Sequence, residues 1–355
     1  MPAKQTRSQD AEKTPLTAEK LLLTGKDITD LGEEAELLVG GKNYNTARIS
    51  QIEGIKSPQF RAVSATAFHF FLDEARVDGG LIKKTVDKEY EKINWGGAEA
   101  NADPDFLKNI VRSLGRFLQE KQGADPDGGR VSLREFINRT VSGFADSRED
   151  IDQLRKRSVL IQTAIMSVPL PDKIGEAVAE AYRSICREVG ADQVQVAVRS
   201  SAAGEDSRKK AFAGLQDTYL NITSAKDCVL AYQWDCASAY NLRSMTYRRE
   251  SIRDAAAQAD QTGDPGLVEE AKREWGIENT SLSVCIMRMI DPVISGTAFS
   301  ADTATGCRGR GDNDLVSMDS SYGLGEAVVS GLVTPDKCYC FQPDDGQDVV
   351  IRQMG

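Results

Sequence analysis

The sequence has little histidine: His69 is the only one among 355 residues. It lies in the segment ATAFHFFLDEARV, which is predicted to be a helix capped by Thr66. Phe68, Phe70 and Phe71 are its neighbours, and a histidine among aromatic residues is typical of a packed or half-exposed structural position. We therefore expect His69 to be structural rather than catalytic.

Long apolar runs and paired cysteines are also lacking. No stretch approaches the roughly 18 apolar residues of a membrane helix, and residues 1–20 are polar, without the apolar core of a secretory signal. The seven cysteines form no C-x-x-C pair, which favours buried thiols in a cytoplasmic protein. Cys338 and Cys340 are two residues apart and would share one face of a strand.

Positive charge is in deficit, with 44 Lys and Arg residues against 54 Asp and Glu residues and a formal net charge of -10. This balance argues against nucleic acid or an anionic membrane as the main partner. It leaves a nucleotide possible, because a small basic pocket can lie in an acidic protein. The residues are 40% hydrophobic and 28% charged, as in globular proteins that bury a sizeable core, and the length predicts two or three domains or subdomains.

Helices dominate the first half of the sequence and strands the second. Residues 80–190 are mostly predicted helical, because apolar residues recur there at three-and-four spacing. This order predicts an α+β fold rather than a regular βαβ alternation. The predicted strands are QFRAVSA, VQVAVRSS, DTYLNI, SLSVCIMRMI, SGTAFSA, DLVSMDSS and KCYCFQ.

Two cationic segments are candidates for phosphate binding. Gly40-Gly41-Lys42 opens a predicted helix, where glycines allow close approach and the helix start favours anions. An ordinary helix-start loop fits the same residues, since the P-loop spacing is absent. Arg199 ends a predicted strand and could bind phosphate through two hydrogen bonds, or pair with Glu205 or Asp206.

Acidic residues at strand ends are weaker candidates. Gly323-Leu324-Gly325-Glu326 follows a predicted strand, either as a turn brought close to a ligand or simply as a tight turn. Asp302 and Asp319 also lie at the ends of strand-like runs, where capping of a turn is the alternative to metal binding.

Taken in order, these segments resemble a known family. LLVGGKNYNTARIS, IKSPQFRAVSATAFHFFL, VAVRSSAAGEDSRKKAFAGLQDTYLNI, VCIMRMIDPVISGTAFSADTATG and SSYGLGEAVVSGLVTPDKCYCF are similar to the N-terminal nucleotide-binding domain of the phosphoenolpyruvate synthase and pyruvate phosphate dikinase family. The resemblance covers roughly residues 20–355. It implies an ATP-grasp fold with a mobile tail over 1–20, one lobe with a helical insertion over 21–190, and a second lobe over 191–355 across a nucleotide cleft.

The resemblance implies roles for the cationic and glycine motifs. Lys42 and Arg199 would bind the phosphates of ATP. Because they flank the long helical region, we expect them to face one another across the cleft from different lobes. Gly214 and Thr218 would belong to a glycine loop over the phosphates, and we expect the segment 202–214 to be mobile without nucleotide.

The resemblance also implies contacts for three further residues. Glu326 would lie near the nucleotide. Met287 stands where the family usually has glutamine in the strand that holds adenine, so either backbone groups suffice for adenine or nucleotide selectivity is relaxed. Arg243 matches a recurring family arginine whose role stays open. Insertions near 120–165 and 254–280 would be partner surfaces or surface helices.

Some family motifs have no match in the sequence. The family passes the phosphoryl group through a histidine in a Ser-His segment of a swivelling domain, and it holds Mg²⁺ and the phosphates with D-x-E and Q-x-R segments. Neither appears before the final residues IRQMG. We therefore expect ATP and Mg²⁺ as cofactors, a larger phosphohistidine-bearing subunit that completes the site, and no conversion of ATP to AMP by this chain alone.

Such a division is similar to that of phenylphosphate synthase, whose smaller subunit carries the ATP-binding part. The implied reaction converts phenol, ATP and water to phenylphosphate, AMP and phosphate. The alternatives are a split phosphoenolpyruvate synthase acting on pyruvate, another split relative such as an antibiotic-modifying enzyme, and a non-catalytic nucleotide-binding regulatory module. Met287 and the missing motifs favour the module, whereas Lys42, Arg199 and the glycine loop favour an enzyme.

Overall fold

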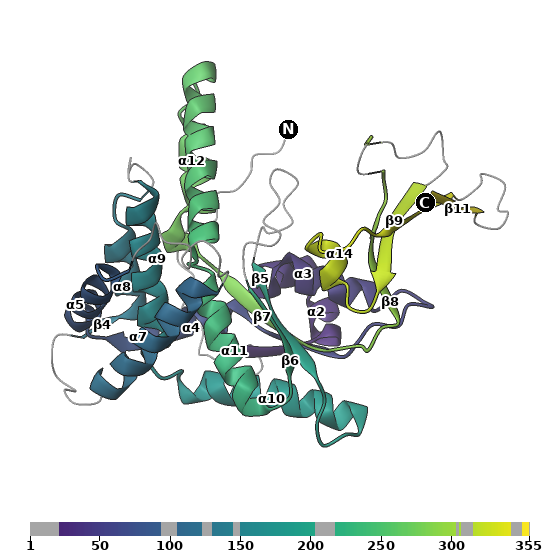
Figure 1. Cartoon of the computed structure of the whole chain (residues 1–355), viewed down its shortest axis with the longest axis horizontal. Coiled ribbons are helices and arrows are strands. Elements are labelled where there is room, and N and C mark those ends of the chain that lie inside the picture. The colour runs from purple at the N-terminus through teal and green to yellow at the C-terminus, as the bar shows by residue number, and fades with distance from the viewer. Residues whose placement is uncertain are drawn as a thin grey trace. The chain divides into compact units, whose positions relative to one another are not determined.

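The computed structural model describes residues 21–93, 105–122, 130–144, 150–202, 217–302, 305–306, 315–341 and 350–354. Contacts between residues divide the chain into two compact units, Met1–Met289 and Ile290–Gly355. Figure 1 shows the helices and strands of both units.

An antiparallel sheet of five strands lies at the centre of the first unit. Its strand order is β1-β2-β7-β5-β6, so segments far apart in the sequence pair directly. The sequence predicted a boundary between lobes at residue 190, but this sheet contains strands from both sides of that residue. The two compact units instead divide after Met289. The strands are β1 (Leu22–Thr24), β2 (Phe60–Val63), β5 (Val196–Ala202), β6 (Thr218–Ile222) and β7 (Leu282–Arg288).

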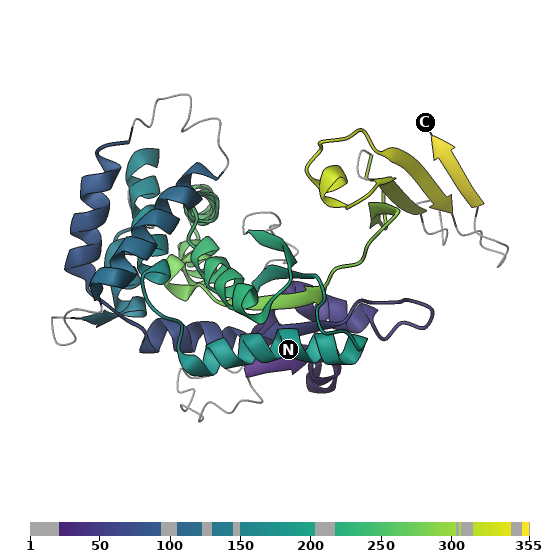
Figure 2. The same ribbon diagram turned by 60° about the horizontal axis from the view of Figure 1, so that its bottom comes forward.

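Alternating side chains give this sheet two apolar faces. Val198, Val284 and Ile286 belong to the main core, where α4 (Ala65–Glu74), α10 (Asp172–Val189) and α11 (Ala225–Ser238) pack against the strands. Figure 2 shows α10 running along the sheet. Ala62 and Cys285 face the other way, into a smaller core beneath α2 (Gly25–Leu31) and α3 (Ala35–Ile49).

A group of helices extends the main core away from the sheet. Its centre is α9 (Ile151–Met166), which is almost entirely buried from Ser158 onward because α5, α7, α8, α11 and α12 pack around it. Asp78, Ser132 and Asp150 cap α5, α8 and α9 through their side-chain oxygens. The other members are α5 (Gly79–Tyr90), α7 (Phe106–Gln122), α8 (Leu133–Val141) and the short pair β3 (Arg76–Val77) and β4 (Val131–Ser132).

A helical hairpin completes the first unit. Its arms, α12 (Leu242–Thr262) and α13 (Gly266–Trp275), share a small cluster formed by Ile252, Ala271 and Trp275. Single 3-10 turns lie at Gly32–Glu34 and Ile277–Asn279. Among the residues that the structure describes, no helix combines the length and the apolar character needed to span a membrane.

The second unit is an antiparallel sheet of four strands in the order β11-β10-β9-β8, with the short helix α14 (Glu326–Val329). Cys338 and Cys340 share one face of β10, opposite Met318 and Val316 of β9, as predicted. Helices with antiparallel sheets confirm the α+β class. The strands are β8 (Ile294–Phe299), β9 (Leu315–Tyr322), β10 (Asp336–Phe341) and β11 (Val350–Met354).

Candidate functional site

The glycines of the first cationic motif lie at a break in α3. Gly40 has φ 73° and ψ 162°, which interrupts the helix, so a new helical segment starts at Gly41 and Lys42. A Cβ atom on Gly40 would lie 2.4 Å from the carbonyl oxygen of Ser201, so only glycine lets α3 approach the end of β5 this closely. The prediction that this motif opens a helix is confirmed, although a helical turn also precedes it.

Buried hydrogen bonds fix this helix start on the sheet. The backbone N–H of Asn43 donates to Ser201 Oγ at 3.2 Å, and Asn43 Nδ2 donates to Ser283 Oγ at 3.1 Å. Ser283 Oγ in turn donates to the carbonyl oxygen of Val63 at 2.8 Å. These contacts join α3 to β5, β7 and β2, and they set the position of Lys42, the residue before Asn43.

Arg199 lies on the sheet face that α3 covers. It is two residues before Ser201 on β5, so both side chains share that face. In the sheet register Arg199 is opposite Cys285 on β7 and Thr218 on β6. Burial raises the pKa of the Cys285 thiol to about 12, with the Arg199 guanidinium acting in the opposite direction. Arg199 itself is exposed, so its charge is available to solvent or to a ligand.

The sheet register also places the predicted adenine-strand residue. Met287 is two residues beyond Cys285 on β7, opposite Ala197 on β5, and therefore shares the Arg199 face. It is half-buried and packs against the small core with Leu38 and Tyr44. Its neighbourhood is thus apolar on one side, which suits a flat ring better than a charged group.

The structure brings the first group of predicted residues together within one unit. Lys42, Arg199, Thr218 and Met287 all belong to α3 or to three adjacent strands, and α3 packs on β5 and β7. The prediction that Lys42 and Arg199 come from different lobes is wrong, because β5 pairs within the sheet that α3 covers. An exposed arginine, Arg199, and a half-buried lysine, Lys42, beside a helix start form a surface suited to an anion.

Asp217, which the sequence did not single out, occupies the position before Thr218 and has several partners. Lys108 Nζ lies 3.1 Å from Asp217 Oδ2, and the Arg243 guanidinium lies 3.4 Å from Oδ1. The backbone N–H of Asp217 donates to Ser238 Oγ at 3.4 Å. Arg243 therefore has a structural partner on the segment that leads into Thr218. Gly214 and residues 203–213 of the predicted glycine loop lie outside the described residues.

The acidic candidates belong to the second unit. Glu326 is exposed and begins α14 directly after the Gly323 turn, where Gly323 has φ 79°. Asp302 accepts hydrogen bonds from Thr305 at 2.5 Å and Tyr339 at 3.2 Å, and Asp319 lies 3.9 Å from Lys337 Nζ. Throughout the described ranges no three His, Cys, Asp or Glu residues gather into a cluster that could hold a metal ion.

His69 is half-buried on α4, as expected. Its Nε2 lies 3.2 Å from Ser281 Oγ, and its Nδ1 lies 3.2 Å from the Arg134 guanidinium. Burial lowers the pKa of His69 and Arg134 lowers it further, whereas Asp73 raises it. The predicted cap of this helix is wrong: Ser64 occupies the N-cap position and Thr66 lies inside the first turn.

The sequence of this chain is similar to a known protein family and to several curated proteins. The family described as pyruvate phosphate dikinase, AMP/ATP-binding domain, matches residues 36–355. Phosphoenolpyruvate synthase of Pyrococcus furiosus is 29% identical over 312 residues, covering 88% of this chain and 32% of that protein. The Synechocystis enzyme of the same name is 35% identical over 285 residues, covering 74% and 31%.

A relative with another name is rifampicin phosphotransferase of Bacillus subtilis. It is 38% identical over 205 residues, covering 58% of this chain and 20% of that protein. The chain therefore spans about a third or less of the length of these curated relatives.

Proposed function

This chain belongs to the pyruvate phosphate dikinase, AMP/ATP-binding domain family, and on that premise we propose that it binds ATP for phosphoryl transfer to a histidine on another domain. The observation that carries the proposal is the junction of α3 with β5. There a helix start fixed by Asn43 and Ser201 lies on the sheet face that carries Arg199.

In this proposal the cations act on the polyphosphate. Lys42 supplies a point charge at the helix start, and Arg199 supplies a guanidinium that can hold two phosphate oxygens. Preorganised positive charge stabilises the negative charge that is redistributed during phosphoryl transfer. Gly214 and Thr218 would cover the phosphates and Met287 would contact the base. We also propose that Glu326 lies near the nucleotide and that the fold is of the ATP-grasp type, with two lobes around the nucleotide.

The acceptor is proposed to be a histidine outside these 355 residues. The only histidine here contacts Ser281 and Arg134 at its two ring nitrogens, so it serves the packing of α4. We therefore propose a larger phosphohistidine-bearing subunit as the partner. Mg²⁺ would neutralise part of the triphosphate charge, held mainly by carboxylates of that partner.

The proposal also names the compound that finally accepts the phosphoryl group. Phenol is proposed on the likeness to the smaller subunit of phenylphosphate synthase, and the reaction would then give phenylphosphate, AMP and phosphate. Pyruvate is the second candidate, because two of the relatives above are named phosphoenolpyruvate synthase. Either reaction suits the cytoplasm, where ATP is available and the six described cysteines stay as free thiols.

The experiment mixes this chain with the histidine-bearing partner and measures AMP with phenol, with pyruvate and with neither. We expect AMP to form only when the partner is present. Repeated turnover should require, in addition, the compound that is the final phosphoryl acceptor. Lys42→Met and Arg199→Met should each weaken ATP binding about 10- to 100-fold, the value of one charge-assisted contact. Arg48→Met, on the exposed side of the same helix, serves as control.

Two outcomes would decide against the proposal. ATP binding that is unchanged in both variants would exclude the α3–β5 junction as the phosphate site. ATP binding without AMP formation, with any partner or acceptor, would indicate a non-catalytic regulatory module.

A further inference from the structure

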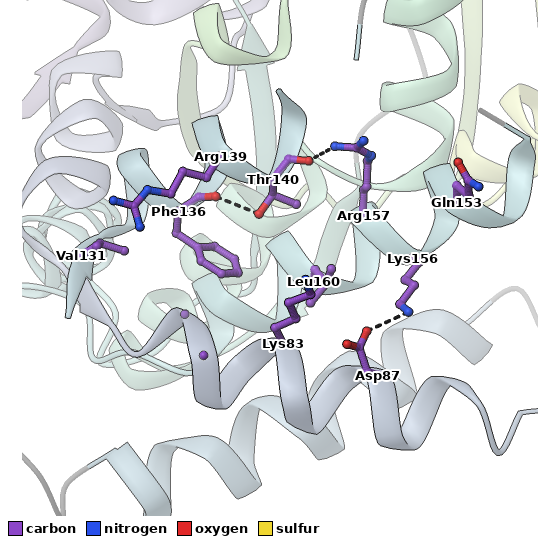
Figure 3. A pocket seen from close by; sticks show the side chains of 12 residues that line it. Lys83, Asp87, Val131, Phe136, Arg139, Thr140, Gln153, Lys156, Arg157 and Leu160 are labelled. Atoms are coloured by element: carbon purple, nitrogen blue, oxygen red, sulfur yellow. Dashed lines mark hydrogen bonds and ion pairs between the residues drawn. The ribbon is translucent and has the colours of Figure 1, made fainter. Parts of the chain in front are cut away.

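A hollow in the helical part of the first unit is separate from the elements that carry the proposed ATP site. It has a volume of about 620 Å³ and is lined by α5, β4, α8 and α9 (Figure 3). Pockets of this size are typical of small-molecule sites. No lining residue belongs to α3 or to the five-stranded sheet.

The charge of this pocket is opposite to that of the protein. Lys83, Arg139, Lys156 and Arg157 line it, whereas Asp87 is the only carboxylate among the described residues that line it. The chain as a whole has a formal net charge of -10. A local excess of cations in a concave surface raises the local concentration of anions.

Two of these cations are held in place by the neighbouring helices. Lys156 Nζ lies 2.7 Å from Asp87 Oδ1, which joins α9 to α5. The Arg157 guanidinium donates to the carbonyl oxygen of Thr140, which joins α9 to α8. Figure 3 shows both contacts as dashed lines at the wall of the pocket. These contacts engage Lys156 and Arg157, which therefore contribute positive charge to the wall of the pocket.

Apolar side chains form the floor between the cations. Phe136 and Leu160 line the pocket while being 7% and 9% exposed. A Cβ atom on Gly79 would lie 3.0 Å from the Phe136 ring, so glycine at the start of α5 lets that helix pack closely on the ring. The pocket thus offers an apolar floor with positive charge on its walls.

We propose that this pocket binds a small organic anion in which a carboxylate is attached to an apolar body such as an aromatic ring. The carboxylate would contact Lys83 and Arg139, the two lining cations that are exposed, and the ring would lie against Phe136 and Leu160. Arg139 also pairs with Glu135 across one helical turn, an exposed pair that is weak enough to rearrange.

The test uses 4-(trifluoromethyl)benzoate as the probe, with binding to the full chain followed by ligand-observed fluorine NMR. We expect a Kd of about 1 mM or tighter. The uncharged probe 4-(trifluoromethyl)benzamide should bind several-fold more weakly. Saturating ATP should leave benzoate binding unchanged, because the pocket and the proposed ATP site lie on different elements.

Matched variants assign the signal to this pocket. Lys83→Gln should weaken benzoate binding about two- to fivefold and Lys83→Gln with Arg139→Gln about tenfold, as expected for partly exposed charges. Lys84→Gln removes the same charge from the next residue of α5, which is exposed and does not line the pocket, and should change nothing.

Three results would overturn the proposal. They are the absence of binding to the wild-type chain, an equal effect of Lys83→Gln and Lys84→Gln, and displacement of the probe by ATP. Thermal unfolding of each variant checks that the helices around the pocket remain folded.

Discussion

Replacing Gly40 with alanine tests whether the close approach of α3 to β5 shapes the nucleotide site. Gly40 combines φ 73° with ψ 162°, a region of backbone space that is essentially reserved for glycine. Its missing Cβ would also lie 2.4 Å from the Ser201 carbonyl oxygen and 2.5 Å from Ser201 Oγ. Alanine would therefore meet both a conformational and a steric penalty.

The magnitude follows from these two penalties. A strained backbone conformation costs about 1–3 kcal/mol, and overpacking against a fixed neighbour costs about 1–3 kcal/mol more. The nearest atom belongs to the backbone of paired strand β5, so it cannot turn aside as a side chain could. We expect Gly40→Ala to lower the free energy of unfolding by about 3–5 kcal/mol, and to weaken ATP binding by shifting Lys42.

Gly190→Ala provides the matched control. Gly190 has φ 75° and ψ 31° at the end of α10, and nothing lies within 4 Å of a Cβ atom placed on it. This change should cost only about 1 kcal/mol, the penalty of a positive φ alone. Urea unfolding followed by circular dichroism measures both variants. Equal losses in Gly40→Ala and Gly190→Ala would refute the argument that the Ser201 backbone demands glycine.

Five other substitutions, in three separate tests, probe the remaining contacts. Asn43→Leu should lower the free energy of unfolding by about 2–3 kcal/mol, because it removes the buried amide that donates to Ser283 Oγ; a loss below that of Gly190→Ala in the same urea titration would contradict this. Asp217→Asn should destabilise the chain most, Lys108→Met less and Arg243→Met least. The reason is that the side chains of Asp217, Lys108 and Arg243 are 14%, 27% and 65% exposed. Thermal unfolding that gives the reverse order would reject Asp217 as the centre of these ion pairs. Burial lowers the pKa of His69 below 6.5 in the folded chain, so the unfolded chain binds more protons and stability falls as the pH drops below the unfolded pKa. His69→Gln should therefore lose less free energy of unfolding than the wild type when the pH is lowered from about 7.5 to about 5.5. Urea titrations at the two pH values measure this loss, and an equal loss in both proteins would show that His69 does not contribute.

The sequence predicted the elements with strong periodicity and the family motifs on them. The helix at 106–122 and the strands at 282–288 and 336–341 agree with the predicted segments, because apolar spacing reports directly which face is buried. The helix start at Gly41 was also visible, since two glycines before a polar helical run form a local signal.

Contacts between distant residues could not be predicted in the same way. Asn43 is separated from Ser201 by 158 positions and from Ser283 by 240, and no local pattern specifies such a pairing. The predicted boundary at 190 assumed that consecutive segments form separate lobes, whereas β5 pairs with β7 and β7 with β2. The strands at 22–24, 76–77 and 131–132 are too short to show a period of two.

The sequence also failed to predict residues whose role depends on an ion pair or a pocket formed with distant residues. Asp217 and Lys108 look like ordinary surface charges in the sequence, and only the fold brings them to 3.1 Å. The cationic pocket likewise combines α5, α8 and α9, whose charges are spread from Lys83 to Arg157. Its existence depends on how three helices pack, which their separate patterns do not encode.

The most direct measurement of the central claim follows the phosphoryl group. ATP labelled with ³²P at its β and γ positions is incubated with this chain and the histidine-bearing partner, and the label is located on the separated polypeptides. The account predicts acid-labile label on the partner's histidine, none on this chain, no change with His69→Gln, and a large loss with Lys42→Met or Arg199→Met. Label on His69, or full labelling of the partner by the two cation variants, would contradict it.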